Sequence, residues 1–214
     1  MSGKQLLRLA LLAPFGLAYI WLGHQASIAS NPPLASLLIG LAPLAFSAVA
    51  LAWQARSIWL IGLCVATLGL ILSHLGFLTA NAAWVYFIQH AGTHALLGLM
   101  FGRTLRGPDA EALCSKVSQF VFPGQLDADY YRYTWWVTLA WTLYFGLASL
   151  LSVLLFWLAP IEIWSVYANL LTPLIIGAIF AIEFAIRLRV LPRNRHASIA
   201  QTIRAYREYS QRRP

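Results

Sequence analysis

The stretch from Tyr133 to Leu158 reads YTWWVTLAWTLYFGLASLLSVLLFWL, and it is the clearest indication of the fold class. This stretch contains no Asp, Glu, Lys or Arg, and large aliphatic and aromatic side chains fill most of it. A helix of about 20 apolar residues crosses a hydrocarbon core of about 30 Å, so the stretch is long enough to span a bilayer. The sequence therefore predicts a transmembrane helix here.

The composition of the whole chain agrees with a lipid environment. Of its 214 residues, 60% are hydrophobic and 10% are charged, whereas soluble domains carry roughly 25% charged residues. A net charge of +8 would suit nucleic acid, but the basic residues lie at the ends of apolar runs and not along one face. This pattern is typical of topology signals in membrane proteins. It excludes a soluble enzyme and a nucleic-acid partner.

Further apolar runs on both sides of this stretch predict an all-α, polytopic membrane protein with six transmembrane helices. The six predicted spans cover about residues 6–22, 34–53, 58–78, 83–105, 133–158 and 163–186. Together they form a predicted transmembrane domain over 1–192. In the polar segment 106–132, apolar residues recur at helical spacing, which predicts a short amphipathic helix at the membrane surface. The basic tail, 193–214, is predicted to hold a second interfacial helix.

The basic residues also predict the orientation of the spans. With six spans, all 15 Lys and Arg residues fall on the side of the N-terminus, the 106–132 segment and the tail. The opposite side carries Glu162 and none of these bases. Because cytoplasmic loops of membrane proteins are enriched in Lys and Arg, we expect both termini in the cytoplasm of a bacterial inner membrane.

Histidines within the predicted spans form the first candidate site. His90 and His94 are four residues apart on one face of the fourth span, and His74 falls near the outer end of the third. Imidazoles on facing helices can bind a metal or haem, or relay protons. The alternative is that they hydrogen-bond across helices, as polar residues in membrane bundles commonly do. We favour this alternative, and we predict no cofactor.

The second candidate site is an acid–base pair at the inner end of the sixth span. Glu183 and Arg187 are separated by one helical turn, and Arg132 and Arg103 are expected at a similar depth. A structural ion pair is one interpretation, and a site for a lipid phosphate or carboxylate headgroup is the other.

Backbone features of two spans complete the set of candidates. Pro173 lies within the sixth span and removes a backbone hydrogen bond near Asn169, which predicts a helix kink. Such kinks line cavities in transporters, and they are also common in membrane helices generally. Gly98 and Gly102 form a small-xxx-small pair that permits close packing of helices.

The second half of the chain also resembles a known group of proteins. The residues that carry the resemblance are Arg132–Thr134, Val137–Thr142, Tyr144, Phe145, Trp164, Asn169–Leu171, Glu183, Phe184, Arg187, Arg189, Leu191 and Pro192. They resemble small proteobacterial inner-membrane proteins, some of which are encoded in gene clusters for aryl-polyene-type lipids. In that group the positions after Tyr-Thr are often basic, whereas here they are Trp135 and Trp136. The resemblance implies an envelope-lipid or polyketide context and names no reaction.

These observations lead to one expected function and two alternatives. We expect an accessory or scaffold subunit of the inner membrane, not an enzyme, in the assembly or transfer of an acyl or polyene lipid. Its expected partners are membrane lipids and acidic acyl-carrier or other biosynthetic proteins on the cytoplasmic face, and an oligomer is compatible with the sequence. The alternatives are an intramembrane redox, metal or haem protein that uses His74, His90 and His94, and a small transporter or channel.

Overall fold

The structure is a computed structural model, which describes residues 3–29, 32–124 and 126–191. Every regular element within these ranges is helical, and no strand occurs in them. The elements are α1 (Gly3–Ile28), α2 (Leu34–Gln54), α3 (Ile58–Ser73), α4 (Leu75–Ala80), α5 (Ala82–Gly102), η1 (Arg103–Arg106), η2 (Asp109–Glu111), α6 (Leu113–Val121), α7 (Ala128–Leu158), α8 (Ile161–Ser165), η3 (Val166–Leu171) and α9 (Thr172–Val190). The all-α prediction is therefore confirmed. The predicted interfacial helix over 193–214 lies outside the described residues.

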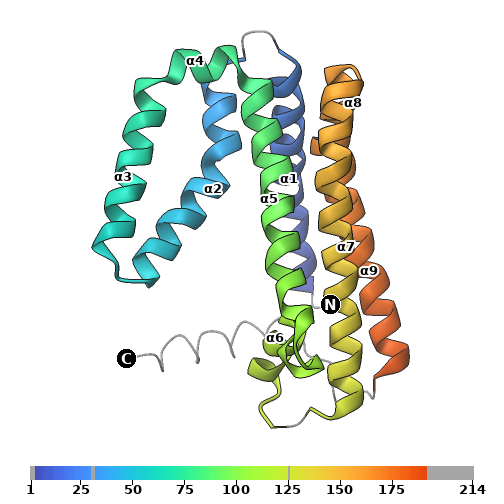
Figure 1. Cartoon of the computed structure of the whole chain (residues 1–214). Coiled ribbons are helices and arrows are strands. Elements are labelled where there is room, and N and C mark those ends of the chain that lie inside the picture. Colours follow the sequence, from blue (N-terminus) through green and yellow to red (C-terminus); the bar gives the residue numbers. More distant parts are fainter. Residues whose placement is uncertain (1–2, 30–31, 125, 192–214) are drawn as a thin grey trace. The chain divides into compact units, whose positions relative to one another are not determined.

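The chain divides into two compact units, and each is described by itself. Unit 1 is drawn from Met1–His90 and Ser152–Pro173, and unit 2 from Ala91–Leu151 and Leu174–Pro214. In unit 1, α2 and α3 lie side by side, and α4 leads from the end of α3 to the start of α5 (Figure 1). The buried core of this unit is formed by Ala26, Leu37, Ala82, Tyr86, Trp164 and Ala168.

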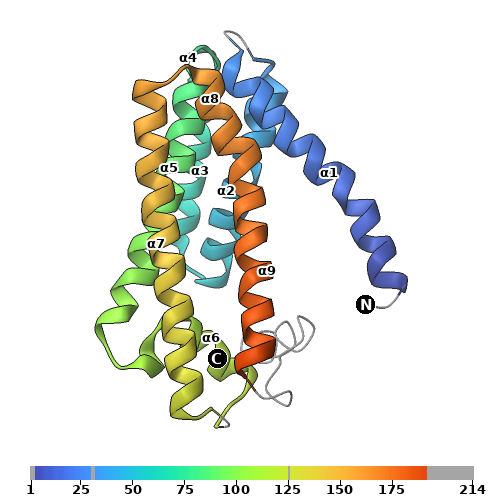
Figure 2. The same ribbon diagram turned by 90° about the vertical axis from the view of Figure 1, so that its right-hand side faces the viewer.

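The first two helices follow the predicted spans, with one difference in length. Helix α1 is 26 residues long and extends beyond the predicted span 6–22 at both ends. It continues through Pro14 as one long helix (Figure 2). The Ser27 hydroxyl donates to the Gly23 carbonyl at 2.6 Å, which gives this buried side chain a hydrogen-bond partner within its own helix. Helix α2 begins at the predicted residue and ends one residue later than expected.

The predicted third span, 58–78, differs most from the structure. It is divided at His74 into α3 and α4, and α4 ends at Ala80, two residues beyond the predicted end of the span. The Ser73 hydroxyl donates to the Leu70 carbonyl at 3.0 Å, and His74 Nδ1 lies 3.1 Å from the same oxygen. These side chains compete with the backbone for the hydrogen bonds of a regular helix, which accounts for the break.

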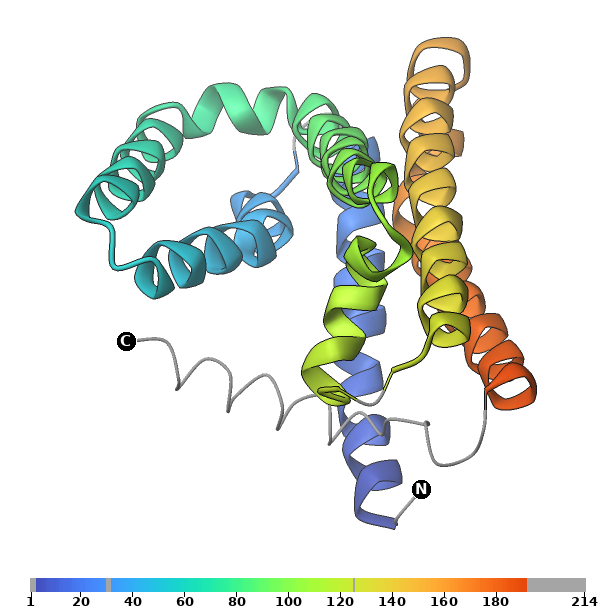
Figure 3. The same cartoon turned by 60° about the horizontal axis from the view of Figure 1, so that its bottom comes forward.

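Unit 2 contains the predicted amphipathic segment. Helix α6 covers Leu113–Val121, and it lies beside the first turns of α7 (Figure 3). Helix α7 begins at Ala128, five residues before the predicted start of the fifth span, because the Asp127 carboxylate accepts the Tyr130 N–H at 3.0 Å and caps the helix. The predicted fourth span, 83–105, is α-helical only as far as Gly102, and η1 continues it as a 3₁₀ turn.

The predicted sixth span, 163–186, is a helical run from Ile161 to Val190 that is interrupted by π-helical turns over Val166–Leu171. The Thr172 N–H bonds to the carbonyl of Tyr167, five residues back, instead of to a carbonyl four residues back. Pro173 follows immediately and has no N–H to donate. The departure from α-helical geometry thus lies directly before the proline and includes Asn169.

Among the described residues, two helical runs are long and apolar enough to cross a membrane. They cover Ala128–Leu158, with 31 residues, and Ile161–Val190, with 30 residues. Most of their large apolar side chains face outward, and so do those of α3, in which no described residue is buried. For example, Trp59 on α3 is 85% exposed and Leu158 at the end of α7 is 81% exposed. These helices do not have the buried surface that core helices of a soluble protein would have.

Candidate functional site

Unit 1 contains a network of buried and half-buried hydrogen bonds centred on His90. His90 on α5 lies 3.1 Å from the Ser152 hydroxyl through Nδ1, and 3.1 Å from the Thr172 hydroxyl through Nε2. Trp164 Nε1 donates to the same Ser152 oxygen at 3.0 Å. The Thr172 hydroxyl donates to the Tyr167 carbonyl at 2.9 Å. Side chains from α5, α7, α8 and α9 are thereby joined.

The donors in this hydrogen-bond network indicate which ring nitrogen of a neutral His90 carries the proton. The Thr172 hydroxyl has one hydrogen, which it gives to Tyr167, so it must accept from Nε2 of His90. A neutral imidazole that donates through Nε2 accepts through Nδ1, and Ser152 supplies that hydrogen. Ser152 then accepts from Trp164, whose indole can only donate. For a neutral ring, these bonds therefore assign the proton to Nε2, and both ring nitrogens of His90 are bonded.

A second polar cluster in unit 1 joins α1 to the start of the sixth span. His24 Nδ1 lies 2.8 Å from the Ser165 hydroxyl. The Asn169 amide donates to the Ser27 hydroxyl and to the Ser165 hydroxyl, each at 3.2 Å. A Cβ added at Gly23 would lie 2.8 Å from Asn169 Oδ1, so glycine is what permits this approach. Asn169, predicted only as a kink residue, thus connects α1 to η3.

Gly40 is the contact point of three helices in unit 1. Its carbonyl accepts from the Tyr19 hydroxyl at 3.3 Å and from the Gln89 amide at 3.1 Å. A Cβ at this position would meet the Tyr86 ring, with Cε1 at 2.6 Å and Cζ at 2.7 Å. The absence of a side chain at Gly40 therefore lets α5 approach the backbone of α2.

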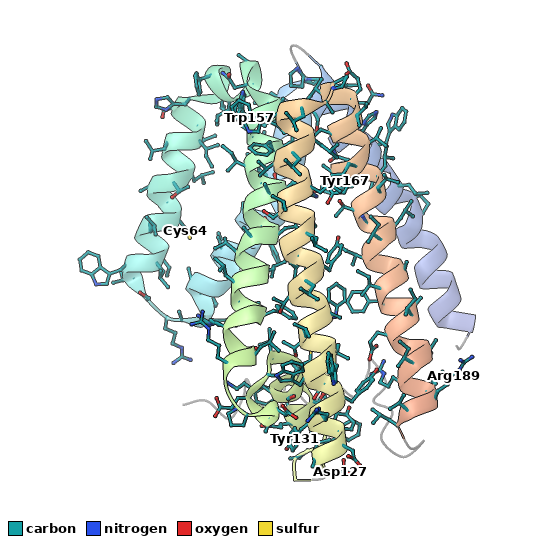
Figure 4. All side chains as sticks on the ribbon, turned by 45° about the vertical axis from the view of Figure 1, so that its right-hand side comes forward. Cys64, Asp127, Tyr131, Trp157, Tyr167 and Arg189 are labelled. Carbon is teal, nitrogen blue, oxygen red and sulfur yellow. The ribbon has the colours of Figure 1, made fainter. Side chains whose placement is uncertain are left out.

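Aromatic rings also pack together in unit 1, around Phe156. Phe87 on α5 stacks on Phe156 at 4.1 Å between centroids, and the Trp164 ring meets Phe156 edge-on at 5.4 Å. Trp84 packs against Phe156 at 4.8 Å and against Trp157, which Figure 4 labels near the end of α7. Such edge-to-face and stacked pairs add to the stability from buried area. Trp164, which is fully buried, links the aromatic cluster to His90.

The three predicted histidines have different surroundings. His74 is exposed at the α3–α4 junction, where its Nδ1 lies 2.8 Å from the neighbouring Ser73 hydroxyl. His90 belongs to the hydrogen-bond network described above. His94, in unit 2, is buried with its ring 6.0 Å from that of Tyr144 and 5.9 Å from that of Phe145. Within the described ranges, no three His, Cys, Asp or Glu side chains come together as metal ligands.

The predicted pair Glu183 and Arg187 comes together on α9 in unit 2. Arg187 Nε lies 3.4 Å from Glu183 Oε1 and has no well-aligned hydrogen bond, so the contact is an ion pair. The Tyr133 hydroxyl donates to the same oxygen at 3.0 Å. Glu183 and Arg187 are 19% and 25% exposed. Arg132 and Arg103 form no ion pair with Glu183 in the part of the chain that the structure describes.

Threonines on α7 hold α6 in place within unit 2. The Cys114 N–H donates to the Thr138 hydroxyl at 3.1 Å, and the Ser115 and Thr134 hydroxyls lie 2.6 Å apart. The Thr104 hydroxyl accepts the Leu113 N–H at 3.0 Å. The first N–H groups of a helix have no partner within it. The Thr104 and Thr138 hydroxyls therefore supply acceptors for the first two N–H groups of α6. Burial raises the pKa of the Cys114 thiol, the Thr138 hydrogen bond lowers it, and the charge of Glu183 raises it further.

Close packing between α5 and α7 within unit 2 involves the predicted glycines. A Cβ at Gly98 would lie 3.4 Å from the backbone nitrogen of Gly146, and one at Gly102 would lie 3.1 Å from Thr142 Cγ2. By contrast, a Cβ at Gly62 on α3 would have nothing within 4 Å.

Sequence reasoning found Glu183, Arg187 and His90 and missed the groups that bind them. Ser152, Thr172 and Tyr133 are ordinary residues of apolar helices, and no local motif distinguishes them. One signal was present, since hydroxyl residues inside a membrane helix need hydrogen-bond partners. Their partners depend on how the helices are rotated, which spacing within one helix does not determine.

Comparisons with known proteins add no relative. No protein-family model matches the chain, and neither the curated proteins nor the solved structures give a match. The resemblance to proteobacterial inner-membrane proteins therefore stays a prediction.

Proposed function

We propose that the chain is a multi-pass protein of the bacterial inner membrane that serves as an accessory or scaffold subunit. One observation carries the proposal: polar side chains inside unit 1 bond to one another across helices, while large apolar side chains face outward. A lipid-embedded scaffold requires this arrangement, because its polar groups have no water to bond and its outer surface contacts acyl chains.

The helix lengths support six spans. Helices α2 and α5 each have 21 residues and are about 31 Å long, close to the hydrocarbon thickness. Helices α1, α7 and the run from Ile161 to Val190 are longer, so they extend beyond it. Helix α3 is shorter and completes a span only together with α4. With the Lys and Arg distribution, these lengths favour two cytoplasmic termini.

The buried Ser–His pairs support a structural role. A nucleophilic serine needs an adjacent base and access to a substrate. Ser152 and Ser165 each have a histidine within hydrogen-bond distance, but both serine side chains are fully buried. Ser152 also accepts the Trp164 indole N–H. Their hydroxyls therefore connect helices instead of facing a substrate.

The charge distribution favours the tail as the segment that attracts an acidic partner. Residues 103–132 contain four basic and four acidic residues, so this segment has no net charge. Residues 193–214 contain six Arg and one Glu. An acidic acyl-carrier protein, or the anionic membrane surface, is therefore attracted to the tail more than to the 103–132 segment. The envelope-lipid or polyketide context rests on the resemblance described above.

Topology reporters test the membrane arrangement. Fusions after Gln25, Asn81 or Ile161 should report the periplasm, and fusions at Arg56 or Gly107 should report the cytoplasm. A cytoplasmic signal at Asn81 would overturn the six-span arrangement, because the alternation that the basic residues indicate would be broken.

Variants of His90 test the scaffold role. In a strain that depends on the chain for its envelope lipid or polyene, His90→Ala should lower product yield only in proportion to the level of folded protein. His74→Ala, an exposed histidine on the same unit, is the matched control and should leave both unchanged. A normal level of folded His90→Ala protein with no product would contradict the scaffold role and favour a catalytic or transport one.

A further inference from the structure

The side chain of Arg187 on α9 is held by its neighbours in unit 2. Its Nε lies against Glu183 at 3.4 Å, and its guanidinium carbon lies 5.5 Å from the centre of the Phe184 ring. Glu183 is itself held by Tyr133, which donates to Oε1 at 3.0 Å and approaches the Glu183 carbonyl at 3.3 Å. A long side chain that normally loses considerable entropy on binding is therefore already ordered.

The contact with Glu183 leaves most of the guanidinium available. It uses Nε, whereas the two terminal nitrogens carry four further N–H groups. No described residue bonds to these terminal nitrogens, and the side chain is 25% exposed. Two parallel N–H groups of an arginine match the oxygens of a phosphate better than an ammonium does.

The surroundings of Arg187 place it at the edge of an apolar surface. On α9, Phe184, Ile186, Leu188 and Val190 are between 47% and 60% exposed. Arg187 lies in the last turn of this helix, within one turn of these apolar side chains. In a bilayer this is the level at which acyl chains give way to phosphate headgroups.

From these observations we propose that Arg187 binds the phosphate of an anionic phospholipid headgroup in the cytoplasmic leaflet, with Glu183 and Tyr133 as positioning residues. The leaflet assignment rests on the proposed topology. Because Glu183 offsets the charge of Arg187, directed N–H bonds and not net charge supply the recognition. Arg189 lies two residues further along α9, is exposed (Figure 4) and has neither a carboxylate nor a tyrosine partner among the described residues.

Lipid retention by the full-length protein tests the site. The purified chain is loaded with phosphatidylglycerol, and bound lipid is measured by native mass spectrometry. A phosphate-free glycolipid with the same acyl chains is the comparison ligand. Arg187→Lys keeps the charge and loses the paired N–H groups, so it should weaken phosphatidylglycerol binding about tenfold, the equivalent of one charge-assisted hydrogen bond. Binding of the glycolipid should not change.

Matched variants separate the site from general electrostatics. Arg189→Lys should bind phosphatidylglycerol like the wild type, whereas Tyr133→Phe, which removes one hydroxyl, should weaken binding and leave the melting temperature within a few degrees. Equal losses for Arg187→Lys and Arg189→Lys, or no loss for either, would overturn the site.

Two further arms separate the ligand source and the leaflet. Inorganic phosphate added in excess should not displace the lipid; displacement would assign the site to free phosphate and overturn the lipid proposal. Reporter fusions that place Gly107 in the periplasm would overturn the topology and the leaflet together. A correct topology with equal retention by all variants would overturn the phosphate site alone.

Discussion

His90 offers the sharpest test of how unit 1 is held together. Its two ring nitrogens bond Ser152 on α7 and Thr172 at the start of α9, each at 3.1 Å. Cross-helix hydrogen bonds in membrane proteins contribute about 0.6 kcal/mol each on average. His90→Ala should therefore lower the free energy of unfolding by about 1.2 kcal/mol from these bonds. The space left by the imidazole adds to this loss.

A double-mutant cycle isolates the hydrogen bond from the lost volume. His90→Ala, Ser152→Ala and the double variant are unfolded in detergent, and the free energies are measured from tryptophan fluorescence. We expect a coupling energy of about 0.6 kcal/mol between the two positions. His74→Ala removes an exposed histidine whose partners among the described residues lie in its own helix turn, so it should change the stability by less than about 0.5 kcal/mol.

Two outcomes would contradict the assigned hydrogen bonds of His90. A coupling energy of zero between His90 and Ser152 would show that the two side chains are not bonded. Equal losses for His90→Ala and His74→Ala would show that the bonds to α7 and α9 add nothing to stability. Nitrogen NMR of labelled His90 gives an independent check, because the assignment requires a neutral ring protonated at Nε2.

Three further predictions concern other parts of the chain. Gly40→Ala should lower the unfolding free energy by about 1–3 kcal/mol, because a Cβ would overlap the Tyr86 ring. Gly62→Ala is the control, because a Cβ at Gly62 meets no atom, and it should be nearly neutral. Thermal unfolding of both variants checks this prediction. In a Cys64→Ala background, alkylation of Cys114 should need a higher pH than alkylation of a free cysteine, because burial raises the pKa of its thiol. Glu183→Gln should increase the alkylation rate, because the charge of Glu183 also raises this pKa. A pH series that matches free cysteine would contradict this prediction. If His74, His90 and His94 do not bind haem or a metal, the purified protein should show no Soret absorption and less than one equivalent of transition metal; a Soret band lost in His90→Ala would establish the redox alternative.

The all-α class and most helix positions could be predicted from the sequence because they depend on local features. Apolar runs near 20 residues long gave α2 and α5 to within a few residues of their ends. The start of α7 was missed because the Asp127 carboxylate caps the helix five residues before the apolar run begins, and an apolar run does not show where a cap lies. The division at His74 was missed because the third run is apolar throughout its length. Hydropathy does not show that the Ser73 and His74 side chains bond to the carbonyl of Leu70.

The candidate site was less predictable, since it depends on contacts between helices. Glu183 and Arg187 are one turn apart on one helix, so helical geometry alone brings them together. Tyr133 reaches the same carboxylate from α7, 50 residues away in sequence. Whether it does so depends on the rotation and depth of α7 beside α9. Neither quantity follows from the composition or periodicity of either helix.

The same limit explains why the histidine pattern was ambiguous. His90 and His94 have the i, i+4 spacing of a ligand pair, and that spacing alone favours neither a metal nor a structural role. What distinguishes the roles is the set of partners on other helices. A metal-binding imidazole needs one nitrogen available to the ion, whereas both nitrogens of His90 lie 3.1 Å from hydroxyl oxygens. Binding of an ion by His90 would therefore require the loss of its bond to Ser152 or to Thr172, and the stability of the Ser152→Ala variant measures what that loss costs.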